Sequence, residues 1–185
     1  MRLLLDRLYA LALGVAAACL VTIALLVGAQ VTGRLYDIIV RLFGLPLSGF
    51  IVEGLPEICG YLLAASSLLA LAGTLKAGAH IRITMLLQAT PPAFRRALEL
   101  VAHGLGIALT AFATYSLLAL TLESIRFSEV SYGLVPVPLA LPQSVMTLGM
   151  AVLCIAICDE FFTVLRRGRP SYSAAEDAIS LGKEG

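Results

Sequence analysis

The side chains best suited to acid–base or metal chemistry in this sequence are two histidines, His80 and His103. Glu99 precedes His103 by one helical turn, a spacing at which a carboxylate and an imidazole can pair. Such a pair more often stabilises the fold than takes part in catalysis. No Ser-His-Asp set, zinc-ligand spacing or glycine-rich phosphate loop accompanies the histidines. We therefore predict that the chain is not an enzyme and has no catalytic residue, metal site or bound cofactor.

The four cysteines do not form a redox or metal-binding motif either. They include no CxxC pair, have no histidine beside them, and lie in or next to apolar segments: Cys19, Cys59, Cys154 and Cys158. We interpret them as small hydrophobic residues rather than disulfide partners or metal ligands. A four-helix membrane haem protein is an alternative, but it needs histidine ligands inside its helices, and His80 lies in a loop. An absorbance spectrum of the purified protein tests this alternative, because bound haem absorbs visible light.

His103 and the four cysteines lie in four long segments without Lys, Arg, Asp or Glu, at 8–33, 58–75, 100–122 and 130–158. Because a helix rises about 1.5 Å per residue, roughly 20 apolar residues cross the ~30 Å hydrocarbon core of a bilayer. Continuous apolar segments lack the two-residue alternation of a membrane β-barrel. The chain is 59% hydrophobic and 14% charged, with a mean hydropathy of +0.95. We therefore predict an all-α membrane protein embedded in the lipid bilayer.

We expect a single four-helix membrane domain over 1–165 and a polar cytoplasmic tail over 166–185. The predicted spans are about 8–31, 55–75, 97–122 and 143–165. The segment after the second span mixes basic and apolar residues, as is typical of a chain that lies at the membrane interface. Residues 34–43 repeat apolar side chains at helical spacing. They form an amphipathic stretch that either lies along the outer membrane surface or extends the first helix.

The basic residues predict how the chain is oriented. With the N-terminus in the cytoplasm, ten of the thirteen Lys and Arg residues fall on the cytoplasmic side, and Arg34, Arg41 and Arg126 fall outside. An excess of basic residues on the cytoplasmic side is the usual bias in membrane proteins, so both termini are predicted to be cytoplasmic. The formal net charge of +1 gives no indication of a nucleic-acid partner.

The predicted spans carry no acidic or basic side chain near the middle of the membrane. Ion-coupled transporters that act alone usually place such groups there, and an independent small exporter needs a buried acid within a span. The sequence also lacks the paired glycine- or proline-broken helices that build a substrate site at the midplane. We therefore expect that this chain does not transport a substrate by itself.

Small and polar residues follow one face of each of the last three spans. They are Glu53, Glu57, Gly60, Ala64 and Ser67 in the second, Glu99, His103, Gly106, Thr110 and Thr114 in the third, and Gln143, Thr147, Ala151, Cys154 and Cys158 in the fourth. Small residues let helices approach closely, and hydroxyl or amide groups hydrogen bond across the contact. These faces pack against one another within the chain, or they contact a second membrane protein. Periodicity alone does not separate the two interpretations.

Three features resemble the small (Q-type) integral membrane subunit of tripartite ATP-independent periplasmic (TRAP) transporters. Residues 78–87, Gly-Ala-His-Ile-Arg-Ile-Thr-Met-Leu-Leu, are similar to the "HIRV-D-LL" signature that follows the second span in that family. Glu53 and Glu57 resemble the acidic residues that precede this span. Residues 136–143, Pro-Val-Pro-Leu-Ala-Leu-Pro-Gln, resemble the "iPlwiPq" stretch before the fourth span. The similarity extends over about 41–165.

The resemblance implies an accessory subunit of a sodium-driven, binding-protein-dependent uptake system in a bacterial-type inner membrane. In this family the large membrane subunit carries the substrate and ion sites, a periplasmic substrate-binding protein delivers an organic acid, and the small subunit is a static scaffold. We expect these residues to fix the bundle or contact the large subunit: Glu57, Gly60, His80, Arg82, Gly106 and Gln143. The small membrane subunit of tricarboxylate-type tripartite transporters has a similar plan and is the main alternative.

Overall fold

The computed structural model describes residues 2–77 and 92–167, and these ranges contain four long helices. The helices are α1 (Arg2–Leu42), α2 (Leu55–Lys76), α4 (Pro92–Arg126) and α5 (Ala140–Arg167). Each is long and apolar enough to cross a membrane. The prediction of an all-α membrane protein with four spans is therefore confirmed. The expected interfacial segment after the second span and nearly all of the expected tail lie outside the described residues.

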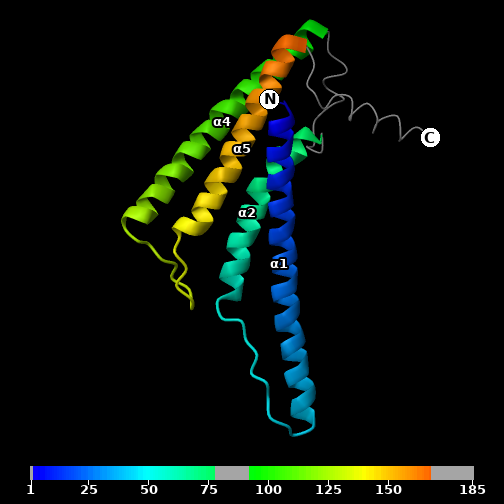
Figure 1. Cartoon of the computed structure of the whole chain (residues 1–185), viewed down its shortest axis with the longest axis vertical. Helices are drawn as coiled ribbons and strands as arrows, with labels where there is room; N and C mark the ends of the chain where they lie inside the picture. The colour runs from blue at the N-terminus through cyan, green and yellow to red at the C-terminus, as the bar shows by residue number, and fades with distance from the viewer. Residues whose placement is uncertain (1, 78–91, 168–185) are drawn as a thin grey trace, which may run out of the picture.

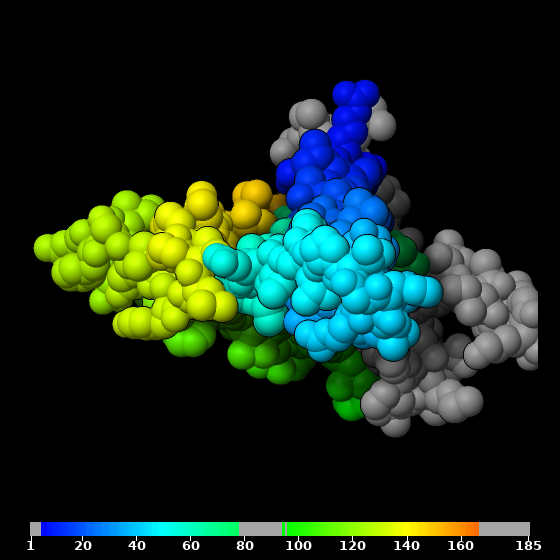
Figure 2. Space-filling model, turned by 90° about the horizontal axis from the view of Figure 1, so that it is seen from below, coloured from blue at the N-terminus to red at the C-terminus, as the bar shows by residue number. Residues whose placement is uncertain are grey.

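The helices form an open layer rather than a closed four-helix bundle. Extensive contacts join α1 to α2, α2 to α5, and α5 to α4, so the order across the layer is α1–α2–α5–α4. Consecutive helices run in opposite directions, and the start of α1 lies near the end of α5 (Figure 1). Seen from below, the layer has an elongated outline, with α1 and α4 on its outer sides (Figure 2).

Helix α1 extends well beyond the predicted first span. It is a single 41-residue helix that includes the amphipathic stretch as far as Leu42. That stretch therefore extends the first helix. At about 1.5 Å per residue the helix is roughly 60 Å long, about twice the thickness of the hydrocarbon core. Its C-terminal part projects past the ends of the other three helices (Figure 1).

The chain that follows α1 folds back along this projection and is fastened to it. Asp37 accepts hydrogen bonds through Oδ1 from the Ser48 backbone N–H at 2.7 Å and the Ser48 hydroxyl at 2.8 Å. Its Oδ2 accepts one from the Gly49 N–H at 3.3 Å. The Phe50 ring packs on Gly33, where an added Cβ would lie 2.8 Å from the ring. The projection therefore consists of the end of α1 and a segment, 43–54, that is hydrogen bonded to it. We call this segment the return segment.

The proline-rich segment between α4 and α5, 127–139, is not helical. An isolated antiparallel bridge joins Val130 to Pro138 in this segment. Helix α5 begins at Ala140, three residues before the predicted start of the fourth span, and Pro142 lies in its first turn. Proline is tolerated there because the N–H groups of a first helical turn have no intrahelical acceptor.

The apolar core lies where α1, α2 and α5 meet, in the half of the layer that contains the N-terminus. Its buried side chains are mostly small: Tyr9, Ala12 and Ala16 in α1, Leu69 and Ala72 in α2, and Val152 and Ala156 in α5. Small residues allow the three helix backbones to approach closely. Helix α4 joins this unit chiefly through α5.

Candidate functional site

The contact between α2 and α5 depends on a glycine. A Cβ added to Gly149 of α5 would lie 2.9 Å from both the carbonyl carbon of Leu68 and the backbone nitrogen of Leu69 in α2. Side chains do not normally approach a backbone so closely, so residue 149 must be glycine for the two helices to pack at this distance. Sequence reasoning did not select Gly149, because periodicity does not tell which glycine faces a neighbouring helix.

A charged cluster joins three helices at the end of the layer that holds the N-terminus. Nζ of Lys76 in α2 lies 3.2 Å from Oδ1 of Asp6 in α1 and 3.4 Å from Oδ2 of Asp159 in α5. The ammonium group also lies 5.3 Å from the centre of the Tyr9 ring. Partly exposed ion pairs of this kind contribute at most about 1 kcal/mol each, so the cluster mainly fixes the relative positions of the helices. Sequence reasoning missed it because the partners are far apart along the chain.

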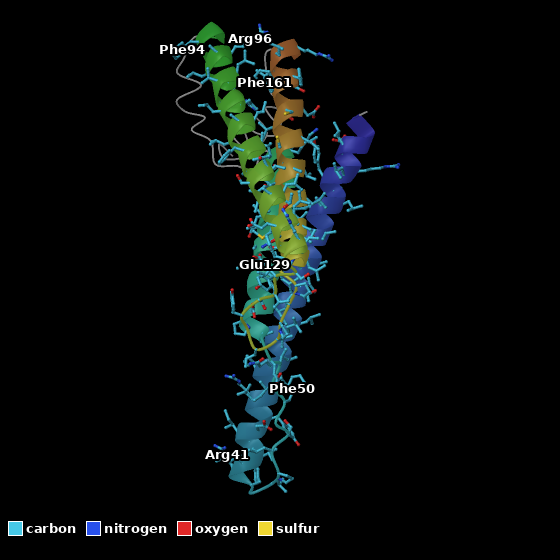
Figure 3. The ribbon with its side chains drawn as sticks, turned by 90° about the vertical axis from the view of Figure 1, so that its left-hand side faces the viewer. Arg41, Phe50, Phe94, Arg96, Glu129 and Phe161 are labelled. Atoms are coloured by element: carbon cyan, nitrogen blue, oxygen red, sulfur yellow. The ribbon has the colours of Figure 1, made fainter. Side chains whose placement is uncertain are left out.

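Helices α4 and α5 share a buried polar seam near the same end. Glu99 and His103 of α4 and Glu160 of α5 are buried, and Glu160 has no exposed surface. Nδ1 of His103 lies 2.7 Å from the backbone oxygen of Glu99 and 3.8 Å from its Oε2, so the pair expected from the one-turn spacing is present. Arg96 donates a hydrogen bond to the carbonyl of Leu165 at 2.8 Å. Figure 3 shows Arg96 and Phe161 at this end of the two helices.

The small and polar faces of α4 and α5 meet each other inside the chain. Thr121 and Thr147 lie 3.1 Å apart through their hydroxyl oxygens. A Cβ on Gly106 would lie 3.4 Å from the Ile157 side chain, so Gly106 belongs to the α4–α5 contact. Gln143 is half-buried near the start of α5, and its Oε1 has no hydrogen-bond partner among the described residues. Both faces are therefore used largely for packing within this chain.

Glu57, at the other end of α2, contacts the segment between α4 and α5. It accepts a hydrogen bond from the Tyr61 hydroxyl at 2.7 Å. Gly133 lies directly against the Glu57 carboxylate, and any side chain at that position would collide with it. Glu57 also stands in the first turn of α2, where a negative charge is favourable for the helix dipole. Its position is suited to fixing the fold rather than to binding a substrate.

Gly60 is placed differently, on the outside of the layer. It is exposed, and nothing lies within 4 Å of the position of an added Cβ. Pro56, Leu63 and Ser67 are also exposed, and their spacing of three or four residues puts all four on one face of α2. We call this face the Gly60 strip. His80 and Arg82, the other expected contact residues, lie outside the described residues.

Large apolar surfaces remain uncovered on the outer helices. The most apolar stretch of α4 is only 6% buried. Its exposed side chains include Val101, Leu105, Leu109, Phe112 and Tyr115. Within 2–77 and 92–167, no group of three or more His, Cys, Asp or Glu residues is arranged to hold a metal ion. The polar contacts lie towards the helix ends, and the surfaces between them suit lipid or a membrane partner.

Apolar helices in an open layer, fastened by polar contacts near their ends, define a multi-pass membrane protein whose broad surfaces are available to neighbours in the membrane. Residues 25–167 match the family model of the DctQ component of tripartite ATP-independent periplasmic transporters. The chain therefore belongs to this family of small TRAP transporter subunits, as the resemblance implied. The family is one of transporter components rather than enzymes. Comparisons with curated proteins and with solved structures gave no match.

Proposed function

We propose that this chain is the static membrane scaffold on which the large subunit of its TRAP transporter moves. The complete system takes up an organic acid delivered by a periplasmic binding protein, and a sodium gradient drives the uptake. The chain lies in a bacterial-type inner membrane with both termini in the cytoplasm. Sodium coupling and the class of substrate are taken from the family resemblance. The scaffold role is supported by the physical properties of this chain.

The observation that carries this proposal is the absence of charge from the middle of the described helices. In α1, for example, no Asp, Glu, Lys or Arg occurs between 8 and 33, and in α2 none occurs between 58 and 75. An ion-coupled carrier places charged or strongly polar groups at this depth, because they bind the ion and the substrate. The sites for both ligands therefore belong to another subunit.

The distribution of basic residues supports the proposed orientation. Seven of the described Lys and Arg residues lie at the end of the layer that holds the N-terminus: Arg2, Arg7, Lys76, Arg95, Arg96, Arg166 and Arg167. Arg34, Arg41 and Arg126 lie towards the opposite helix ends. This asymmetry favours a cytoplasmic location for the first end.

The Gly60 strip is the best candidate contact for the large subunit. Membrane helices associate most closely through small residues, and Gly60 and Ser67 stand exposed on α2 with no neighbour from this chain at Gly60. Gly106, by contrast, already packs against Ile157. The strip lies on α2, one of the two central helices of the layer. A partner that binds there contacts a helix that is held on both sides, by α1 and by α5.

The alternatives from the sequence have less support. The family match favours a TRAP-type system over a tricarboxylate-type one. A haem protein would use histidine pairs on facing helices, whereas His103 is packed against Glu99 of its own helix.

Copurification tests the partnership. A tagged copy of this chain, coexpressed with the large hydrophobic subunit encoded beside it and extracted in mild detergent, is expected to recover that subunit in a stoichiometric complex. An unrelated four-helix membrane protein with the same tag serves as the control. The proposal is wrong if no large subunit is recovered and if cells that lack this chain still take up the substrate.

A further inference from the structure

The outer projection of α1 carries a groove that the scaffold role does not use. The groove has a volume of about 400 Å³. It is lined by Arg34, Asp37, Ile38 and Arg41 of α1 and by Leu47, Phe50 and Ile51 of the return segment. We call it the α1 groove. Figure 3 shows Arg41 and Phe50 on the projecting part of the molecule, beyond the level of Glu129.

The charges of the groove suit an anion. Arg34 and Arg41 are seven residues apart, which is two helical turns, so they lie on the same face of α1. Asp37 stands between them, but its two carboxylate oxygens are turned to Ser48 and Gly49 and accept three hydrogen bonds there. Neither arginine forms an ion pair with any residue in the described part of the chain. The groove lining therefore has two arginines and a net charge of +1, and Arg41 also interacts electrostatically with Asp37.

The surroundings of these charges suit a lipid rather than a soluble molecule. Phe50 and Ile51 of the return segment are 48% and 66% exposed, and both line the groove. Burying apolar surface of this kind away from water is strongly favourable. Phe50 packs on Gly33, on the membrane side of Arg34, so an acyl chain that runs from a phosphate at Arg34 into the membrane passes this ring.

The depth of the groove in the membrane also fits a lipid headgroup. The charge-free part of α1, 8–33, is about 39 Å long at about 1.5 Å per residue. A bilayer is about 30 Å thick across its hydrocarbon core and about 40–45 Å thick with its headgroups. Arg34 therefore stands at the level of the phosphates. Arg41 lies about 10 Å further along the helix axis, and less than that along the membrane normal when the helix is tilted.

We propose that the α1 groove binds one anionic phospholipid of the outer leaflet. Arg34 and Arg41 hold its phosphate through charge-assisted hydrogen bonds, which guanidinium groups form in a bidentate geometry. An acyl chain lies along Phe50 and Ile51 towards the membrane interior. The lipid fixes the projection of α1 at the outer surface, in the way that basic sites on membrane proteins recognise anionic headgroups. This proposal does not depend on the scaffold function.

Native mass spectrometry of the purified, delipidated chain tests the proposal. The chain is titrated with phosphatidylglycerol and, separately, with phosphatidylcholine of the same acyl composition. We expect one phosphatidylglycerol to bind at least about ten times more tightly than phosphatidylcholine, because only the anionic lipid gains from the two arginines. The double variant Arg34→Gln/Arg41→Gln is expected to lose this preference. Arg126→Gln removes a third exposed outer arginine, away from the groove, and is expected to keep it.

The other outcomes overturn the proposal. Equal binding of the two lipids by the wild-type chain excludes a site for anionic lipid, and this comparison does not depend on how any variant folds. Competition by millimolar inorganic phosphate indicates a site for free phosphate instead. If the double variant keeps the lipid preference but no longer copurifies with the large subunit, the groove is a protein contact. Circular dichroism of the double variant checks that its helices are intact.

Discussion

The variant Gly149→Leu is expected to separate α2 from α5 and to yield little folded protein. A Cβ alone would lie 2.9 Å from backbone atoms of Leu68 and Leu69, and leucine adds three further carbons. Overpacking a tight contact costs typically 1–3 kcal/mol, and a rigid backbone neighbour places this variant at about 3 kcal/mol or more. For a chain of this size that corresponds to a fall of roughly 6–12 °C in the melting temperature. Thermal unfolding of the detergent-solubilised chain measures it.

Two further variants serve as controls for Gly149→Leu: a smaller substitution at the same position, and the same substitution at an open position. Gly149→Ala introduces only the Cβ and is expected to give an intermediate loss of stability. Gly14→Leu places the same large side chain on α1, where nothing lies within 4 Å of the added Cβ, and is expected to melt like the wild type. If Gly149→Leu melts within 2 °C of the wild type, roughly the effect of 1 kcal/mol or less, the close α2–α5 contact is wrong.

Gly60→Leu is expected to have the opposite effects: the chain folds normally, but it no longer binds the large subunit. Open space surrounds Gly60, so the leucine does not disturb the layer itself. It does prevent a helix of the large subunit from approaching α2 closely. We expect at least a tenfold loss of copurified large subunit, equivalent to about 1.4 kcal/mol, and a matching loss of uptake. Substrate preference is expected to stay unchanged, because in the proposed scaffold role the substrate site belongs to the large subunit.

Gly28→Leu is the matched control for Gly60→Leu. Gly28 is also an exposed helical glycine, with nothing within 4 Å of an added Cβ, but it lies on α1. It is expected to leave copurification unchanged. If both variants recover normal amounts of the large subunit, the Gly60 strip is not the contact surface. If the complex forms but its substrate preference changes, this chain takes part in substrate binding.

The sequence was sufficient to predict the four spans, because long charge-free segments leave the chain no alternative to crossing the membrane. It also predicted the Glu99–His103 contact, since two residues one turn apart on a helix are neighbours in any fold. Helix α5 begins at Ala140, three residues before the predicted start of the fourth span, with Pro142 in its first turn. Proline in a first helical turn does not prevent the helix from forming.

The arrangement of the helices could not be predicted from the sequence in the same way. Small residues on a helix face indicate a close contact but not its partner, so Gly106 inside the layer and Gly60 on its surface looked equivalent. The Lys76 cluster joins Asp6, Tyr9 and Asp159, whose distances along the chain carry no signal in a single sequence. Periodicity is also the same for an amphipathic stretch that bends onto the membrane and for one that continues straight, as α1 does.

Transport by reconstituted components tests the central claim most directly. Liposomes with an imposed sodium gradient are prepared with this chain alone, with the large subunit alone, or with both, and the binding protein is added with the radiolabelled organic acid that whole cells take up by this system. We predict that the acid accumulates only when both subunits are present. Sodium-dependent accumulation by this chain alone would show that its uncharged helices carry the substrate, and it would contradict the scaffold role.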